Sequence, residues 1–161
     1  MSVGAGGTTR LAARGGYEGY RRWLLVFASG AVVFGLLHHA DHVIRGNHSG
    51  WPFQAEVTPF TFSLLIYALI LPGIYLTAKG RSVPGYHLFV AAVGLALLGF
   101  VHFVPTEDFE APVGDIFMVY ETPLVGMLAL GVLACLIASV AALGVVAIGA
   151  IRARSRTKEV G

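Results

Sequence analysis

The longest apolar stretch of the chain covers residues 123–151 and reads PLVGMLALGVLACLIASVAALGVVAIGAI. The hydrocarbon core of a bilayer is about 30 Å thick, so a helix needs roughly 20 apolar residues to cross it. This stretch is longer than that and consists mainly of Leu, Val, Ala and Gly. It therefore predicts a transmembrane helix that tilts in the bilayer or protrudes from it.

Three further stretches are apolar over a sufficient length, and they cover about residues 23–43, 59–78 and 84–104. Hydrophobic residues make up 56% of the 161 positions and charged residues only 12%, whereas a soluble domain carries about 25% charged residues. Two of the four stretches begin with a Thr-Pro pair, at Thr58-Pro59 and at Thr122-Pro123. This pair is typical of a helix N-terminus, because the threonine hydroxyl caps a free backbone amide and proline has no amide hydrogen to satisfy. The expected fold is all-α, an integral membrane four-helix bundle in contact with the lipid bilayer.

Basic residues mark one side of this predicted bundle. Ten of the 11 lysines and arginines lie in the N-terminal segment, the link between the second and third stretches, or the C-terminal tail: Arg10, Arg14, Arg21, Arg22, Lys79, Arg81, Arg152, Arg154, Arg156 and Lys158. By the positive-inside rule, both termini are cytoplasmic in a multi-pass protein of the cell membrane. The expected organisation is a cytoplasmic segment 1–22, a transmembrane domain 23–151 and a basic cytoplasmic tail 152–161.

Acidic residues mark the opposite, outer side. Seven of the nine lie in or beside two loops at about residues 45–57 and 105–122: Asp41, Glu56, Glu107, Asp108, Glu110, Asp115 and Glu121. The small formal net charge of +2 is thus the sum of two faces of opposite sign. A basic surface for nucleic acid is not indicated, and no nucleic-acid partner is expected.

The two halves of the chain resemble each other at a shift of 64 residues. His38 aligns with His102, Gly35 with Gly99, and the Thr-Pro pair at Thr58 with the pair at Thr122. This pattern predicts an internal repeat of two tandem helical hairpins in parallel orientation. His38 and His102 are then expected at equal depth and facing one another, with Gly35 and Gly99 allowing their helices to approach closely.

Three histidines are expected to meet near the outer ends of the first and third helices. His38 and His42 are four residues apart, so they lie on one side of a helix together with Asp41. An i, i+4 histidine pair is a common pair of helical metal ligands, and His102 is the candidate for a third ligand. Imidazole suits zinc, copper and iron. The sequence therefore predicts a transition-metal site made by His38, His42 and His102.

Two carboxylates near this site are candidate catalytic residues. If the metal site is catalytic, the expected chemistry is metal-assisted redox or hydrolysis on an apolar substrate, and Asp41 or Glu121 would move protons. Nothing in the sequence fixes the substrate, and it leaves open whether the protein is an enzyme.

Two alternatives to this metal site stay open. His38 and His102 could be the axial ligands of a b-type haem, which two neighbouring transmembrane helices can hold. The polar cluster could instead pack against another membrane protein or a second copy, so that the chain is a non-catalytic accessory subunit. His39 points about 100° away from His38 on the same helix, and we expect it to be an interfacial or helix-packing residue rather than a ligand.

Overall fold

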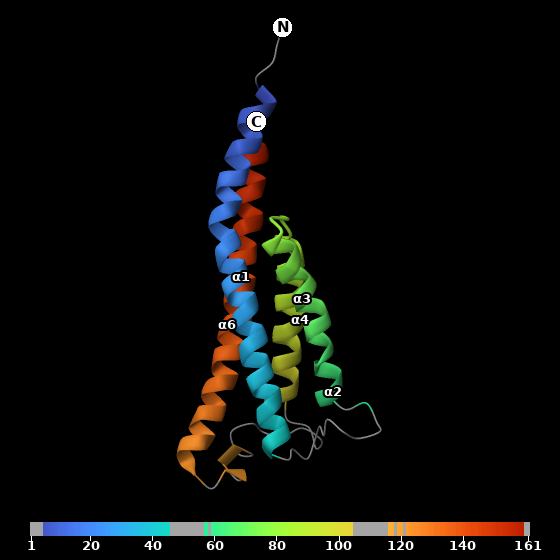
Figure 1. Ribbon diagram of the computed structural model, residues 1–161, viewed down its shortest axis with the longest axis vertical. Helices are drawn as coiled ribbons and strands as arrows, with labels where there is room; N and C mark the ends of the chain where they lie inside the picture. Colours follow the sequence, from blue (N-terminus) through green and yellow to red (C-terminus); the bar gives the residue numbers. More distant parts are fainter. Residues whose placement is uncertain are drawn as a thin grey trace.

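The chain folds into a bundle of long helices. The computed structural model describes residues 5–45, 57, 59–104, 116–117, 119–120 and 122–159. The helices labelled in Figure 1 are α1 (Ala5–Arg45), α2 (Pro59–Ser63), α3 (Leu65–Ala78), α4 (Pro84–Phe103) and α6 (Pro123–Glu159). The described ranges contain no β-strand, and the expected all-α class is confirmed.

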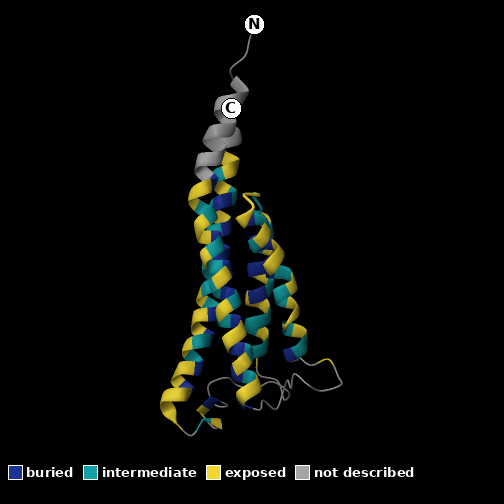
Figure 2. Cartoon of the chain, viewed as in Figure 1, coloured by how far each residue is buried: buried dark blue, intermediate teal, exposed yellow. Residues whose placement is uncertain are grey.

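Four helical stretches are long and apolar enough to cross a membrane: Tyr17–Arg45, Phe60–Ala78, Pro84–Phe103 and Pro123–Arg156. They coincide with the four stretches predicted from the sequence. Large hydrophobic side chains are exposed on their outward faces, among them Leu37, Ile44, Leu128 and Val145, and exposed positions run along these faces in Figure 2. Such faces are stable against lipid rather than water. The membrane-spanning four-helix bundle is therefore confirmed.

The longest helix of the C-terminal half, α6, holds the bundle together. It lies side by side with α1 along most of its length (Figure 1) and also packs against α4. Gly30 of α1 faces Ser139, and a Cβ atom at Gly30 would lie 3.2 Å from the Ser139 hydroxyl; Gly94 of α4 meets Val140 in the same way at 3.3 Å. Small residues at these crossings let the helices pack closely. In a lipid environment, such close van der Waals packing is a main source of helix association.

The turn between α3 and α4 is built from local hydrogen bonds. Gly80 has a positive φ of 76°, a backbone conformation that glycine adopts without strain. This lets the Arg81 amide donate to the Leu76 carbonyl at 2.9 Å, which closes the end of α3 as a Schellman motif. Arg21 of α1 donates to the Ala78 carbonyl at 2.9 Å. Its positive charge therefore lies at the C-terminal end of α3, where the helix dipole is negative.

Close to this turn, α3 and α4 are in direct contact. The Thr77 hydroxyl and His87 Nε2 are 2.7 Å apart, and both side chains are fully buried. The Tyr86 hydroxyl donates to the Leu69 carbonyl, and a Cβ atom at Gly73 would lie only 3.0 Å from the Tyr86 ring. The hairpin is therefore closed at its turn, and the cavity described below lies toward its other end.

The second span is divided into α2 and α3 at Leu64. The Ser63 hydroxyl donates to the Phe60 carbonyl at 2.6 Å, and the Tyr67 amide bonds the Leu64 carbonyl in a tight i to i+3 turn. A serine side chain that bonds its own backbone competes with regular helical hydrogen bonds. The break turns Ser63 and Tyr67 toward α1.

The N-terminal end of α1, the C-terminal end of α6 and the α3–α4 turn point to the same end of the bundle (Figure 1). The opposite ends of α1 and α4 carry His38, His42 and His102.

The internal repeat stays a prediction. An exact two-fold relation would make the contact between α1 and α6 equal to the contact between α4 and α3, but α1 packs along α6 far more extensively than α4 packs along α3. The expectation for Gly99 is wrong: a Cβ atom there would meet nothing within 4 Å, and Gly35 makes room for Tyr67 of α3 rather than for α4.

Candidate metal centre

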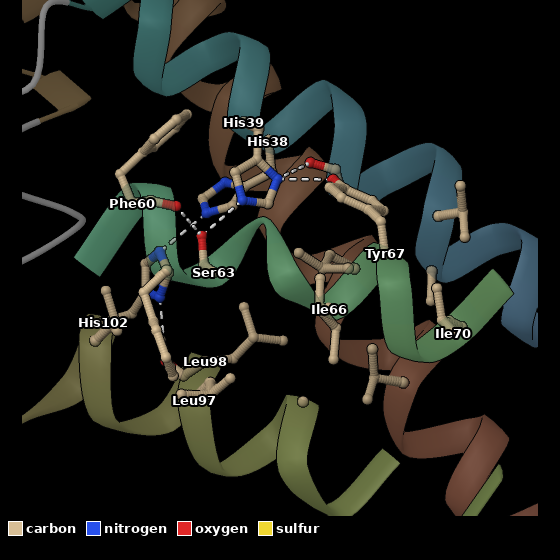
Figure 3. A pocket seen from close by; sticks show the side chains of 18 of the residues that line it. His38, His39, Phe60, Ser63, Ile66, Tyr67, Ile70, Leu97, Leu98 and His102 are labelled. Carbon is tan, nitrogen blue, oxygen red and sulfur yellow. Dashed lines mark hydrogen bonds between the residues drawn. The ribbon is translucent and has the colours of Figure 1, made fainter. Parts of the chain in front are cut away.

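The three histidines singled out in the sequence meet in the structure. His38 and His42 lie one turn apart near the end of α1, and His102 lies in the last turn of α4. Figure 3 shows the rings of His38 and His102 pointing toward one another across the space between the two helices. His38 is buried, with 6% of its surface exposed, and the other two are half-buried.

The Nε2 atoms of these histidines converge. His38 Nε2 lies 3.0 Å from His102 Nε2 and 3.2 Å from His42 Nε2, and the three ligand atoms lie within 4.8 Å of one another. Zinc–nitrogen bonds of 2.0–2.1 Å in a tetrahedron place two ligand nitrogens about 3.3–3.4 Å apart. The separations of 3.0 and 3.2 Å are slightly shorter than this spacing, so these nitrogens would move slightly apart to bind one ion together.

Hydrogen bonds fix part of the orientation of this group. His102 Nδ1 lies 3.1 Å from the Leu98 carbonyl, which only accepts, so Nδ1 carries the hydrogen and the neutral ring keeps a lone pair on Nε2. This lone pair faces His38 Nε2 at 3.0 Å, and His42 Nε2 lies 3.2 Å from the same His38 atom. The Leu98 contact thus holds His102 in the orientation that a metal ligand needs.

Asp41 is held in a separate ion pair. Arg45 Nε donates to Asp41 Oδ2 at 2.9 Å, both side chains are buried, and the Tyr120 hydroxyl donates to Oδ1 at 2.5 Å. Both carboxylate oxygens are therefore engaged, and Asp41 does not line the cavity of the histidines. Arg45, the one basic residue outside the N-terminal segment, the link between the second and third spans and the C-terminal tail, thus has an acidic partner. Glu121 lies outside the described residues.

A second polar group lies beside the three histidines, and its contacts were not predicted from the sequence. His39, expected to be an interfacial or helix-packing residue, packs against the second span: its Nδ1 lies 2.8 Å from the Gly35 carbonyl and 2.7 Å from the Tyr67 hydroxyl, and its Nε2 lies 2.8 Å from the Ser63 hydroxyl. A Cβ atom at Gly35 would lie 3.1 Å from the Tyr67 oxygen. The i, i+4 spacing of Ser63 and Tyr67 on the next span was the available signal.

A cavity of about 460 Å³ extends from the histidines into the bundle. His38, His39, His42, His102, Ser63 and Tyr67 supply the polar side chains at one end. The walls are otherwise apolar and come from α1, α3, α4 and α6, with Ile66, Ile70, Val90, Leu97, Val140 and Leu143 among the lining residues. This is the composition of a small-molecule site, mostly apolar with a few convergent polar groups.

The geometry favours a single ion over the haem alternative. An iron held between two axial imidazoles separates their nitrogens by about twice the metal–nitrogen bond, or about 4 Å, with the macrocycle between them. His38 and His102 are 3.0 Å apart at Nε2, and His42 Nε2 lies on the same side at 3.2 Å. Three imidazoles directed at one point fit a single ion better than they fit the axial positions of a haem.

Comparison of the chain with protein-family models, with curated protein sequences and with solved structures finds no match. The site is therefore interpreted from its own chemistry.

The hydrogen bond from Tyr120 to Asp41 predicts a pH effect. Burial raises the pKa of Tyr120 from 10.0 to about 12, and the bond to Asp41 acts in the same direction. Because the folded state holds this proton more tightly, the stabilising contribution is complete below pH 10 and is lost as the pH rises toward 12. In an alkaline absorbance titration, the difference between the wild type and Tyr120→Phe should have its midpoint near pH 12. A midpoint near pH 10 would contradict the contact.

Proposed function

We propose that the protein binds a transition-metal ion through His38, His42 and His102 and uses it on an apolar substrate held in the adjoining cavity. The convergence of the three Nε2 atoms, with separations of 3.0 and 3.2 Å, carries this proposal. It is supported by the fixed tautomer of His102, whose Nε2 lone pair faces His38 Nε2.

The candidate ions are zinc, copper and iron. Imidazole nitrogens suit these three metals, whereas calcium and magnesium take oxygen ligands. The described carboxylate on the same helix face, Asp41, is already engaged by Arg45 and Tyr120. The donor set is therefore three neutral nitrogens, which favours a borderline metal over a hard one.

Three protein ligands leave one tetrahedral position, as in catalytic zinc sites. All three histidines line the cavity, so a molecule in the cavity reaches that position. A metal there polarises a carbonyl group, activates water or exchanges electrons, depending on its identity. The proposed chemistry is therefore metal-assisted redox or hydrolysis. Asp41 and Glu121 are the proposed proton carriers, and for Asp41 this requires that Tyr120 or Arg45 release one carboxylate oxygen.

We also infer that both termini are cytoplasmic and that the metal site faces outward in the cell membrane. The basic N-terminal segment, the α3–α4 turn and the basic tail point to one end of the bundle, as the positive-inside rule requires of cytoplasmic segments. The three histidines lie at the ends of α1 and α4 remote from that turn.

Metal loading tests the ligand set. Purified protein in mild detergent, equilibrated separately with zinc, copper(II) and iron(II), should retain about one ion of at least one metal per chain after desalting, measured by elemental analysis. Loss of an orienting partner costs about 10- to 100-fold in affinity, so His102→Ala, which removes a ligand, should weaken binding by more than about 100-fold.

The matched control is His87→Gln, because His87 lies on the same helix about four turns from His102, and the amide can keep a hydrogen bond to Thr77. This variant should bind metal as the wild type does, with thermal unfolding of both variants measured alongside. Retention of none of the three metals by the wild type would refute the proposal, as would equal losses in His102→Ala and His87→Gln.

Orientation is tested with reporters fused to either terminus. An alkaline phosphatase domain, which folds only outside the cytoplasm, should be inactive at both ends, and a fluorescent protein that matures in the cytoplasm should be bright at both. Active phosphatase at either terminus would contradict the cytoplasmic location inferred for that terminus.

A further inference from the structure

The polar side chains beside the three histidines satisfy one another. The Ser63 hydroxyl donates to the Phe60 carbonyl at 2.6 Å, so it accepts from His39 Nε2, which lies 2.8 Å away. His39 Nδ1 then carries no hydrogen, and its lone pair accepts from the Tyr67 hydroxyl at 2.7 Å. This second polar group is complete without a ligand. Recognition in the cavity therefore depends on its apolar walls and on the metal centre.

The cavity is elongated along the bundle. Its lining residues on α4 run from Val90 to His102, which is about 18 Å at 1.5 Å per residue. Those on α1 run from Ala31 to His42, or about 17 Å. Toward the α3–α4 turn, the cavity ends where the contacts between α3 and α4 begin. It therefore has a closed apolar end in the middle of the bundle and a polar end at the histidines. Figure 3 shows the histidines on one side of the space and Ile70 farther along α3.

The volume of the cavity corresponds to one hydrocarbon chain. A methylene group takes up roughly the space of a water molecule in the liquid, about 30 Å³. The cavity volume of about 460 Å³ is therefore equivalent to about 15 methylene groups. A phospholipid carries two long chains, and the cavity has space for one.

Side chains that face lipid line one end of the cavity. Val57 is 83% exposed, and Phe62 of α2 and Phe100 of α4 are each 51% exposed. They come from the start of the second span and from the last turns of α4, which is the end that carries the histidines. A hydrocarbon chain of the bilayer therefore reaches the cavity between α2 and the end of α4.

Hydrocarbon suits the closed end of the cavity better than water does. A buried water needs two to four polar partners, whereas the side chains that line this end are apolar: Ile70, Val90, Val140 and Leu143. An empty cavity would deprive these side chains of dispersion contacts. A chain that arrives from the bilayer exchanges one apolar environment for another, so its gain is packing rather than removal from water.

We propose that the cavity binds the hydrocarbon chain of a single-chain membrane lipid, with its methyl end toward Val90 and its polar end at the three histidines. The lipid enters from the bilayer between α2 and the end of α4. This inference rests on the proposed function and deepens it, because it names the substrate class and its orientation at the same site. The part of the lipid nearest the metal is then its polar end and not its methyl end.

The test uses two photoreactive alcohols and protein reconstituted into phospholipid nanodiscs. Both are straight-chain primary alcohols of about 15 carbons, the length that follows from the cavity volume, and they carry a diazirine either next to the methyl end or close to the hydroxyl group. Labelled residues are identified by mass spectrometry, with the unlabelled alcohol as competitor. The methyl-end probe should label Ile70 or Val90 saturably, and the hydroxyl-end probe should label Leu98 or Val101.

Saturable labelling in a bilayer with excess phospholipid supports a site for one chain rather than two. Labelling confined to lipid-facing residues, or labelling that the competitor does not reduce, would overturn the binding site. Labelling of Ile70 by the hydroxyl-end probe instead of the methyl-end probe would overturn the orientation.

Chain length gives a second test. Ile70→Trp adds bulk at the closed end, so it should weaken competition by the alcohol of about 15 carbons at least about 5-fold, the lower end for overpacking, and leave an alcohol of about 8 carbons unaffected. The control is Leu71→Trp, because Leu71 lies on the same helix, is 51% exposed and does not line the cavity; it should change neither alcohol. Equal weakening of both alcohols by Ile70→Trp in folded protein, or equal effects of the two variants, would contradict the proposal. If Ile70→Trp does not fold, the position of labelling in the wild type still decides.

The same labelling of chelator-treated protein and of His102→Ala separates this inference from the metal proposal. Saturable labelling that persists without metal supports the lipid site, even where the protein binds no metal and the proposed function fails. Stoichiometric metal binding without saturable labelling would leave the metal centre standing and refute the lipid site.

Discussion

The contact between His38 and His102 is the constraint on which the half of the bundle remote from the α3–α4 turn depends. It joins two spans whose contact residues are 64 positions apart in the chain and that otherwise touch little, because each packs mainly on α6. A polar nitrogen in an apolar bundle costs several kcal/mol unless it finds a partner. Here the partners are other imidazoles, at Nε2 separations of 3.0 and 3.2 Å.

An ion pair and an apolar cavity surround this contact. Asp41 and Arg45 pair with each other beside the histidines, so the group that could hold an ion consists of three imidazoles. The cavity begins at the same rings and continues between apolar walls. The division of the second span at Leu64 places Ser63 and Tyr67 against His39, so that further polar side chains line the cavity beside the three histidines. Different spans thus supply the histidine group, the other polar side chains and the apolar walls.

The four spans and the meeting of the three histidines were predicted from the sequence because both depend on simple regularities. Length and hydropathy predict the transmembrane helices, and the i, i+4 spacing places His38 and His42 on one face of their helix. The contact of Asp41 with Tyr120 could not be predicted, because Tyr120 lies in a segment without helical periodicity, 79 residues away. The partners of His39 could not be predicted for a similar reason: they lie on another span, and their position depends on a break that Ser63 makes in its own helix. Gly99 was misjudged because a shared sequence position does not ensure a shared packing partner.

The most direct test of the metal centre is X-ray absorption spectroscopy of protein loaded with zinc. Three imidazole ligands should give a first shell of nitrogen and oxygen at about 2.0–2.1 Å together with the multiple scattering typical of histidine rings. This scattering should fall in His102→Ala and stay unchanged in His87→Gln. A spectrum of hydrated zinc without ring scattering, or one that His102→Ala leaves unaltered, would contradict the account.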